Sequence, residues 1–358
     1  MTSTSGARCG TASAGAYQYA GTRMALAPLE SWPGWVIETD YRYWRVNRWV
    51  TIGFYGFWMY DHSELAACLA PDGAGGRCRN DPVSGRASVR LPGVYTVRQA
   101  APDDLAGVRA VARRFGNLAM WPRRPDYLDR ELANGRLLAG FAGTEPVGFG
   151  ATFLRGGLTH LADLFVLPEH QSSGLGRALL ARLLPVTAPR VTFASSDPRA
   201  VALYIRQGMR PVCPLLYLRG PLGGLPGREP TAAAADIAAL DADASGGRRD
   251  ADLAWYAALP GVSVHRTADG YAVVRALGDR VLVGPAGGRT TQACADAVLA
   301  ALAAHRAAGT AALAVLGPNP LLPLLLEAGF SIADMDVFMS SGGDPIALDR
   351  YLPHPDFG

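Results

Sequence analysis

The feature that most constrains this chain is the passage from an apolar strand into a helix through a short loop that contains glycine. Residues 162–167 are mostly apolar, residues 177–184 have a helical pattern, and the sequence at 171–176 reads Gln-Ser-Ser-Gly-Leu-Gly. Gly174 and Gly176 carry no Cβ atom, so a ligand can approach the main chain closely. The amides of the first helical turn have no intrahelical acceptors and attract an anion. This junction therefore predicts a phosphate-binding site made by backbone amides.

A Gly-x-Gly pair on its own is common in tight turns, so the elements around it decide its meaning. Apolar runs upstream predict three strands, and the downstream sequence predicts a strand, a helix and another strand. In chain order these lie at 136–142, 147–154, 158–167, 190–195, 198–207 and 211–219. Before them, residues 95–98 predict a short strand, and residues 102–115 predict a helix with acids in its first turn and one apolar face. The order predicts an α/β (α+β) fold.

This order, the pattern Gln-x-x-Gly-x-Gly at 171–176 and the run Ala-Leu-Tyr-Ile-Arg-Gln-Gly-Met at 202–209 resemble the GNAT family of acyl-CoA-dependent N-acetyltransferases. The resemblance covers residues 94–219. It implies a mixed twisted sheet flanked by helices, acetyl-CoA as co-substrate, and a primary amine of a small molecule as acceptor. It also implies that the loop binds the pyrophosphate of coenzyme A and that Tyr204 protonates the departing thiolate. The family's usual phenylalanine after the helix-closing glycine is Met209 here.

The resemblance places the cofactor contacts on the strand, whose main chain would pair with the pantetheine arm, and on the loop with the start of its helix. The expected residues are Leu164, Phe165, Val166, Gln171, Ser172, Ser173, Gly174, Leu175, Gly176 and Arg177. Tyr204 suits the role of general acid, because a phenol with a pKa near 10 is protonated at neutral pH.

The general base has several candidates. His160 has an ordinary pKa near 6.5, and Asp163 and Glu169 flank the same strand. Strand alternation puts His160 and Asp163 on opposite faces, so at most one of them faces the acceptor. An ordered water could replace any side-chain base. The acceptor is expected between the first helix region, including residues 120–124, and the second half of the chain. Arg123 and Arg124 could attract an acidic acceptor, but a solvated arginine pair is the preferred interpretation.

The second half repeats the order of the first. Residues 271–275, 280–283 and 311–316 predict strands, residues 291–308 predict a long helix, and residues 320–328 predict a helix that ends at Gly329. Aligning Gly329 with Gly208 places Leu325 where Tyr204 stands. We therefore interpret residues 250–358 as a degenerate GNAT-like copy without the acid. The glycine-rich stretch 284–288 is interpreted as a turn rather than as a second coenzyme A site.

Together these patterns predict four segments: an N-terminal extension at 1–93, a catalytic GNAT domain at 94–219, a linker at 220–249 and the degenerate copy at 250–358. The extension is predicted to be partly disordered, with an aromatic-rich β-type element at 32–60. The ending of the chain is also similar to the C-terminal domain of YitH-like acetyltransferases, so the resemblance is to a tandem GNAT arrangement.

Composition limits the remaining possibilities. The net charge of +3 comes from scattered arginines, with no lysine, which argues against a nucleic-acid partner. No apolar run is long enough to span a bilayer, so no membrane is expected. Five cysteines without a paired motif predict reduced thiols in the cytoplasm and no metal site. A monomer and a homodimer are both compatible with the sequence. A non-catalytic acyl-CoA-binding sensor is the alternative to an acetyl-CoA-dependent N-acetyltransferase.

Overall fold

The structure is a computed structural model, and it divides the chain into two compact units, residues 1–83 and 84–358. It describes residues 95–184, 187–226, 236–343, 345–354, 356 and 357, together with the backbone of five short strands that precede residue 95. Those strands are β1 (Ala16–Tyr19), β2 (Thr22–Ala25), β3 (Val36–Ile37), β4 (Trp44–Arg45) and β5 (Val89–Arg90). The predictions for the N-terminal extension otherwise lie outside the described residues.

The first half of the second unit has the predicted order and one helix that the sequence analysis did not predict, α3. The elements are β6 (Tyr95–Gln99), α2 (Leu105–Arg114), α3 (Tyr127–Asn134), β7 (Arg136–Ala142), β8 (Glu145–Arg155), β9 (Leu158–Val166), α4 (Leu175–Leu183), β10 (Arg190–Ser195), α5 (Pro198–Arg206) and β11 (Arg210–Pro221). Short 3₁₀ turns precede α2 and α4. The side chain of Asp126 caps α3 by accepting from the amides of Leu128 and Asp129. The side chain of Asp129 in turn accepts a hydrogen bond from the Asp126 amide.

The second half repeats this order after two additional helices, α6 (Ala238–Ser245) and α7 (Asp250–Ala257). Its elements are β12 (Val262–Arg266), β13 (Gly270–Leu277), β14 (Arg280–Gly288), α8 (Thr291–Ala304), β15 (Thr310–Leu316), α9 (Leu321–Glu327), β16 (Ser331–Ser340) and β17 (Tyr351–Leu352). The mixed α/β fold expected from the sequence is confirmed. Within the described ranges, no helix is long and apolar enough to cross a membrane.

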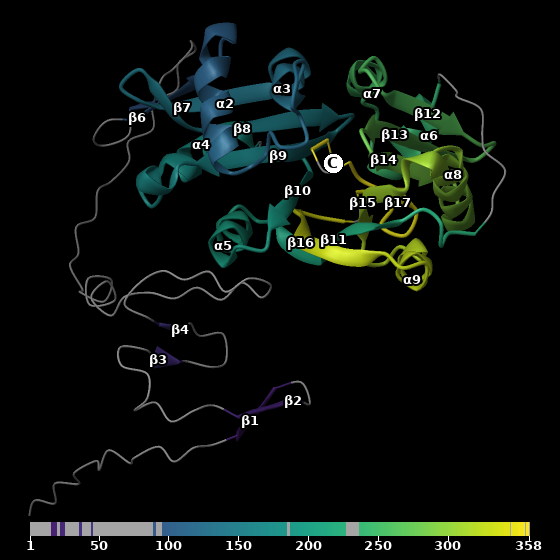
Figure 1. Ribbon diagram of the computed structural model, residues 1–358. Coiled ribbons are helices and arrows are strands. Elements are labelled where there is room, and N and C mark those ends of the chain that lie inside the picture. Colours follow the sequence, from purple (N-terminus) through teal and green to yellow (C-terminus); the bar gives the residue numbers. More distant parts are fainter. Residues whose placement is uncertain are drawn as a thin grey trace, which may run out of the picture. The chain divides into compact units, whose positions relative to one another are not determined.

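One continuous mixed sheet joins the two halves (Figure 1). Its order is β12-β13-β14-β15-β11-β16-β10-β9-β8-β7-β6-β5, and β17 pairs with β14. The last strand of each half lies in the sheet of the other half: β16 pairs with β10, and β11 pairs with β15. Strands β11 and β16 pair with each other at the centre. The halves therefore exchange their final strands.

Alternating side chains give the sheet two apolar faces. In β7, Leu137 packs with the core under α2 and α3, while Leu138 packs with the core under α4. Four leucines of α4 fall on one helical face and are buried: Leu175, Leu179, Leu180 and Leu183. The core under α2 and α3 continues into the second half through Tyr256 and Tyr271. The halves are thus joined by a shared core as well as by the sheet.

The interpretation of residues 284–288 as a turn is wrong, because these residues are the end of β14. Ala286 and Gly287 pair with β17. A Cβ atom on Gly288 would lie 2.5 Å from the Cys294 amide nitrogen at the start of α8. The glycines therefore permit close packing of backbone segments, a role that composition alone does not distinguish from a turn.

Candidate active site

The cleft of the first half begins where β9 and β10 separate. These parallel strands pair only over Thr159–Leu161 of β9, after which β10 continues beside β16. Residues 163–166 of β9 still pair with β8, but residues 162–166 have no strand partner on the side of β10 among the described residues. An open strand edge in the middle of a sheet offers main-chain donors and acceptors to an extended ligand.

The glycine-containing loop lies directly after this open edge. Gln171 is held by two hydrogen bonds, from its Nε2 to the Val166 carbonyl at 3.0 Å and from Arg199 to its Oε1 at 3.3 Å. Ser173 Oγ donates to the His170 carbonyl at 2.7 Å. The side chains of Gln171 and Ser173 therefore shape the loop rather than point freely into solvent.

The loop turns into α4 through left-handed backbone. Gly174 has φ of +88°, and Ser172 has φ of +59°, the only positive φ of a non-glycine residue in the described part of the chain. A Cβ atom on Gly174 would meet nothing within 4 Å, and one on Gly176 would meet nothing closer than 3.8 Å. The space beside the first turn of α4 is therefore open. Alternating left- and right-handed residues before a helix start form a concave anion site of backbone amides.

Tyr204 lies on α5 in the core beneath α4, and its side chain is 6% exposed. Burial raises the pKa of its hydroxyl, and the charges of Asp163 and Asp336 raise the pKa further. The phenol is therefore protonated at neutral pH. Asp336 lies on β16, so the second half contributes to the surroundings of Tyr204, and its carboxylate accepts a hydrogen bond from the Tyr217 hydroxyl at 2.8 Å.

His160 lies on the paired part of β9, before the strands separate, and is 2% exposed. Its Nδ1 lies 3.1 Å from Nη2 of Arg155. Burial lowers the pKa of His160 well below its usual value, and the positive charges of Arg155 and Arg130 lower it further. A neutral imidazole that accepts a hydrogen bond from an arginine is a weak base, and its position suits a structural role.

Asp163 lies on the open part of β9 and faces Glu131 of α3. Glu131 is fully buried, and neither its oxygens nor Oδ2 of Asp163 receive a hydrogen bond from a donor in the described residues. Burial raises the pKa of Glu131 well above its usual value, and the nearby Asp163 charge adds to this. Burial also raises the pKa of Asp163, to about 7. The two carboxyl groups can therefore share one proton at neutral pH.

A third carboxyl group, Asp356, reaches the same region from the end of the chain. Its Oδ2 accepts a hydrogen bond from Nε1 of Trp121 at 2.8 Å, and its charge raises the pKa of both Glu131 and Asp163. Burial raises the pKa of Asp356 to about 6. We refer to Glu131, Asp163 and Asp356 as the acidic cluster. The described residues contain no group of three or more His, Cys, Asp or Glu residues arranged to hold a metal ion.

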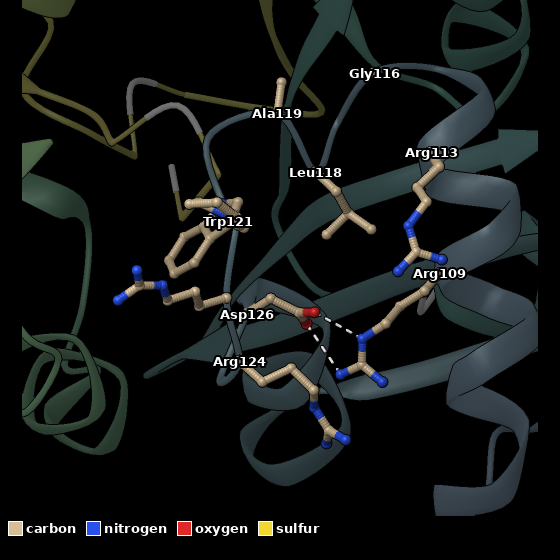
Figure 2. A pocket seen from close by; sticks show the side chains of 10 residues that line it. Arg109, Arg113, Gly116, Leu118, Ala119, Trp121, Arg124 and Asp126 are labelled. Atoms are coloured by element: carbon tan, nitrogen blue, oxygen red, sulfur yellow. Dashed lines mark hydrogen bonds and ion pairs between the residues drawn. The ribbon is translucent and has the colours of Figure 1, made fainter. Parts of the chain in front are cut away.

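Two cavities of about 450 and 500 Å³ lie beside Trp121. They share Ala119, Pro122, Arg123 and Arg124 in their walls. Figure 2 shows the first of them, with the guanidinium groups of Arg109 and Arg113 on α2 and that of Arg124 on the following loop. Arg109 donates to Asp126 in this view. We refer to the two together as the arginine cavity.

The second half has no equivalent open edge in the part of the chain that the structure describes. Strand β14 pairs with β15 over Arg280–Val283, and its continuation at 286–287 pairs with β17. Tyr351 and Leu352 therefore occupy the position that is open beside β9 in the first half. Leu325 of α9, at the position of Tyr204 in the repeat, is fully buried. The second half thus lacks, within these residues, both the open strand edge and the phenol.

The sequence-predicted residues therefore fall into two groups. Asp163 and Leu164–Val166 lie on the open part of β9, Gln171–Arg177 form the loop and the first turn of α4, and Tyr204 packs in the same core cluster as Leu164, Val166 and Leu175. His160 lies on the paired part of β9. Sequence reasoning missed Glu131, Asp336 and Asp356, whereas Trp121 lies within residues 120–124, where the acceptor is expected. The capping pair Asp126 and Asp129 was a readable signal for α3 and hence for Glu131. Asp336 and Asp356 gave no local signal.

Residues 108–209 match the sequence model of the acetyltransferase (GNAT) family. No curated protein matches the chain. Among solved structures, one from Pyrococcus horikoshii, assigned as an acetyltransferase, is 19% identical with a TM-score of 0.61, over 77% of this chain and 99% of that one. A GCN5-related N-acetyltransferase from Kribbella flavida is 18% identical with a TM-score of 0.46, over 69% of this chain and 71% of that one. A tandem GNAT protein from the clavulanic acid biosynthesis pathway is 18% identical with a TM-score of 0.44, over 70% of this chain and 99% of that one.

Proposed function

Because residues 108–209 form a domain of the acetyltransferase (GNAT) family, we propose that the protein transfers an acetyl group from acetyl-CoA to a primary amine of a small molecule. The transfer is direct, within a ternary complex of enzyme, acetyl-CoA and amine. The observation that carries the proposal is the open edge of β9 leading into a helix start with open space beside Gly174 and Gly176. We propose residues 94–219 as the catalytic domain, 220–249 as the linker and 250–358 as the degenerate copy.

The chain would hold acetyl-CoA, which supplies the acyl thioester, mainly by its backbone. The open edge at Leu164–Val166 would pair with the amide groups of the pantetheine arm. The amides of Gly174, Gly176 and Arg177 would donate to the pyrophosphate at the positive end of α4, whereas the Leu175 amide donates to Ser173 Oγ at 3.3 Å. Such a site depends little on side-chain charge, which suits a loop that carries one arginine, Arg177, and no other charged residue.

Asp163 is proposed as the general base. The neutral amine nitrogen attacks the thioester carbonyl carbon, a C–N bond forms, and the nitrogen must then lose a proton. The Asp163 carboxylate, whose pKa of about 7 is near the operating pH, accepts that proton, while Glu131 keeps the shared one. His160 is kept neutral by burial and by the buried arginines, and is the weaker candidate.

Tyr204 is proposed as the general acid. When the tetrahedral intermediate collapses, the C–S bond breaks and the thiolate sulfur needs a proton. The buried, protonated hydroxyl of Tyr204 can supply it, and the anion left on the oxygen is re-protonated from solvent after product release. The closeness of Asp336 disfavours loss of the Tyr204 proton in the resting enzyme, which keeps the acid in its active form.

A non-catalytic acyl-CoA sensor is the second candidate, because the same loop would serve binding alone. Purified full-length protein, acetyl-CoA and a broad panel of amines, with thiol release followed over time, separate the two. The enzyme hypothesis is supported if the rate of thiol release is at least about tenfold lower in Tyr204→Phe than in wild type and acetyl-CoA affinity, measured by calorimetry, is unchanged. Acetyl-CoA binding without release from any amine favours the sensor, and absent binding refutes both.

The location and assembly of the protein are part of the proposal. The two cysteines in the described residues, Cys213 and Cys294, are free, and Cys294 is buried. Free thiols support a reducing compartment such as the cytoplasm. The shared core between the halves could replace the dimer contact of a single-domain enzyme, so a monomer is proposed ahead of a homodimer.

A further inference from the structure

We propose that the acceptor carries an anionic group, a carboxylate or a phosphate, in addition to its amine, and that this group binds in the arginine cavity. The inference rests on the proposed function, because it names the substrate class of the same site. It does not follow from the fold, since the residues concerned lie on α2, on the loop after α2 and on the second half.

The walls of the arginine cavity carry a strong excess of positive charge. They contain six arginines and one acid, Asp126: the arginines are Arg109, Arg113, Arg123, Arg124, Arg275 and Arg280. Arg109 is neutralised by Asp126 and Asp129, and Arg124 also pairs with Asp129. The remaining four arginines have no ion pair among the described residues. A concave site of this charge selects a small anion.

Arg275 points most directly to a ligand. Its guanidinium lies 4.2 Å from the centre of the Trp121 ring, and its Nε and Nη1 atoms are shielded from water without a hydrogen-bond partner in the described residues. Leaving charged donors unsatisfied is costly. Nη2, the third nitrogen of this guanidinium, is not shielded in this way and can donate to an anion in the cavity. Stacking on Trp121 holds the guanidinium in place for such a ligand.

Trp121 links the arginine cavity to the acidic cluster. Its ring lines the first cavity, and its Nε1 donates to Asp356. Asp356 in turn acts electrostatically on Glu131 and Asp163. The indole therefore contacts a carboxyl group through its Nε1 and a guanidinium through its ring face. Burial raises the pKa of Asp356 and the charge of Arg275 opposes that rise, so the two kinds of group act on one another here. A molecule with an amine and an anionic group would match this arrangement, with the amine at Asp163 and the anion at Arg275.

The cavity dimensions favour a small acceptor over a polymer. Volumes of about 450 and 500 Å³ suit a metabolite-sized ligand. Leu118, Met120 and Phe115 pack against the same core as Phe165 of β9, so the loop that bears the arginines is fixed relative to the strand proposed to hold the thioester. The anion would therefore be bound at a defined distance from the reacting carbonyl.

The test uses full-length protein and pairs of amines that differ only in an anionic group, such as an amino acid with its amide, and phosphoethanolamine with ethanolamine. We expect kcat/KM to be at least about tenfold higher for the anionic member than for the neutral member of one pair. If that pair is the amino acid and its amide, the bound group is a carboxylate; if it is phosphoethanolamine and ethanolamine, the bound group is a phosphate. Arg275→Gln and the exposed Arg123→Gln should remove most of that preference, by raising KM for the anionic member much more than for the neutral member. Arg248→Gln, in an exposed ion pair with Asp250, is the control. Preference for the neutral members, or equal loss for both members, overturns the proposal.

A second measurement separates this inference from the proposed function. With coenzyme A saturating, so that its own phosphate sites are filled, inorganic phosphate or acetate is titrated and the melting temperature is recorded. A saturable rise in wild type and Tyr204→Phe that is lost in Arg275→Gln supports the anion site even if no amine releases thiol. If neither anion produces a rise that depends on Arg275, the anion site is refuted even if transfer to neutral amines occurs.

Discussion

Replacing Asp163 by asparagine should stabilise the protein at alkaline pH while it removes activity. In the folded state burial raises the pKa of Asp163 to about 7, whereas in the unfolded chain the value is about 3.9. The folded state therefore binds more protons than the unfolded state between these two values, so this group lowers stability as the pH rises through that window. The asparagine side chain of the Asp163→Asn variant is neutral at every pH, and its amide can donate to Glu131.

The size of the effect follows from the two pKa values. A difference of 1 in pKa corresponds to about 1.4 kcal/mol. The carboxyl of Asp163 then costs the folded state about 2 kcal/mol at pH 5.5 and about 4 kcal/mol at pH 8.5. Differences in shape between the two side chains are the same at both pH values and cancel. The stability advantage of Asp163→Asn should therefore grow by at least about 2 kcal/mol from pH 5.5 to 8.5, because Glu131 also becomes easier to ionise.

Urea unfolding of full-length wild type and variant, followed by tryptophan fluorescence at the two pH values, measures this growth. Asp269→Asn is the control, since Asp269 forms an exposed ion pair with Arg289 and should change stability by no more than about 1 kcal/mol at either pH. An advantage of Asp163→Asn that is the same at both pH values would mean that Asp163 titrates normally. In that case Asp163 and Glu131 would not share a proton, and Asp163 would not be the general base.

The other predictions concern the cleft. Gly174→Ala and Gly143→Ala both place a side chain on left-handed backbone with open space around it. Each variant should therefore lose roughly 1 kcal/mol of folding stability. Only Gly174→Ala should weaken coenzyme A binding, by about tenfold in calorimetry. The value of kcat/KM should rise with pH through an apparent pKa near 7 as Asp163 loses its proton. The His160→Ala variant should show the same rise. If the rise is absent in His160→Ala, then His160 is the general base. Calorimetry should give one coenzyme A per chain, because β17 fills the edge of β14; a stoichiometry of two would contradict that assignment.

The local features of the first half could be predicted from the sequence because each rests on neighbouring residues. The loop at 171–176, the cap at Asp197 and the helix of Tyr204 follow from glycine placement, capping residues and helical spacing. The family match over residues 108–209 agrees with the motifs that were used. Local chemistry was therefore sufficient to predict the loop before α4 and the helix that carries the proposed acid.

The features that depend on distant residues could not be predicted. Strands β11 and β16 both follow a helix closed by glycine, and either could pair with β10 or with β15, so the pattern of each strand does not reveal the exchange. Asp336 and Asp356 reach the cleft only because of that exchange and of the path of the final residues. Residues 284–288 resemble a turn in composition, and only the packing of β17 and α8 explains them as a strand.

The exchange of final strands has a consequence for synthesis on the ribosome. The sheet of the first half needs β16, which is translated more than 130 residues after β10. Until β16 has emerged, β10 presents a bare edge in a nascent chain, which is a hazard for misassembly. Pairings between such distant segments also form slowly. The first half should therefore complete its sheet, and with it the proposed coenzyme A site, only late in translation.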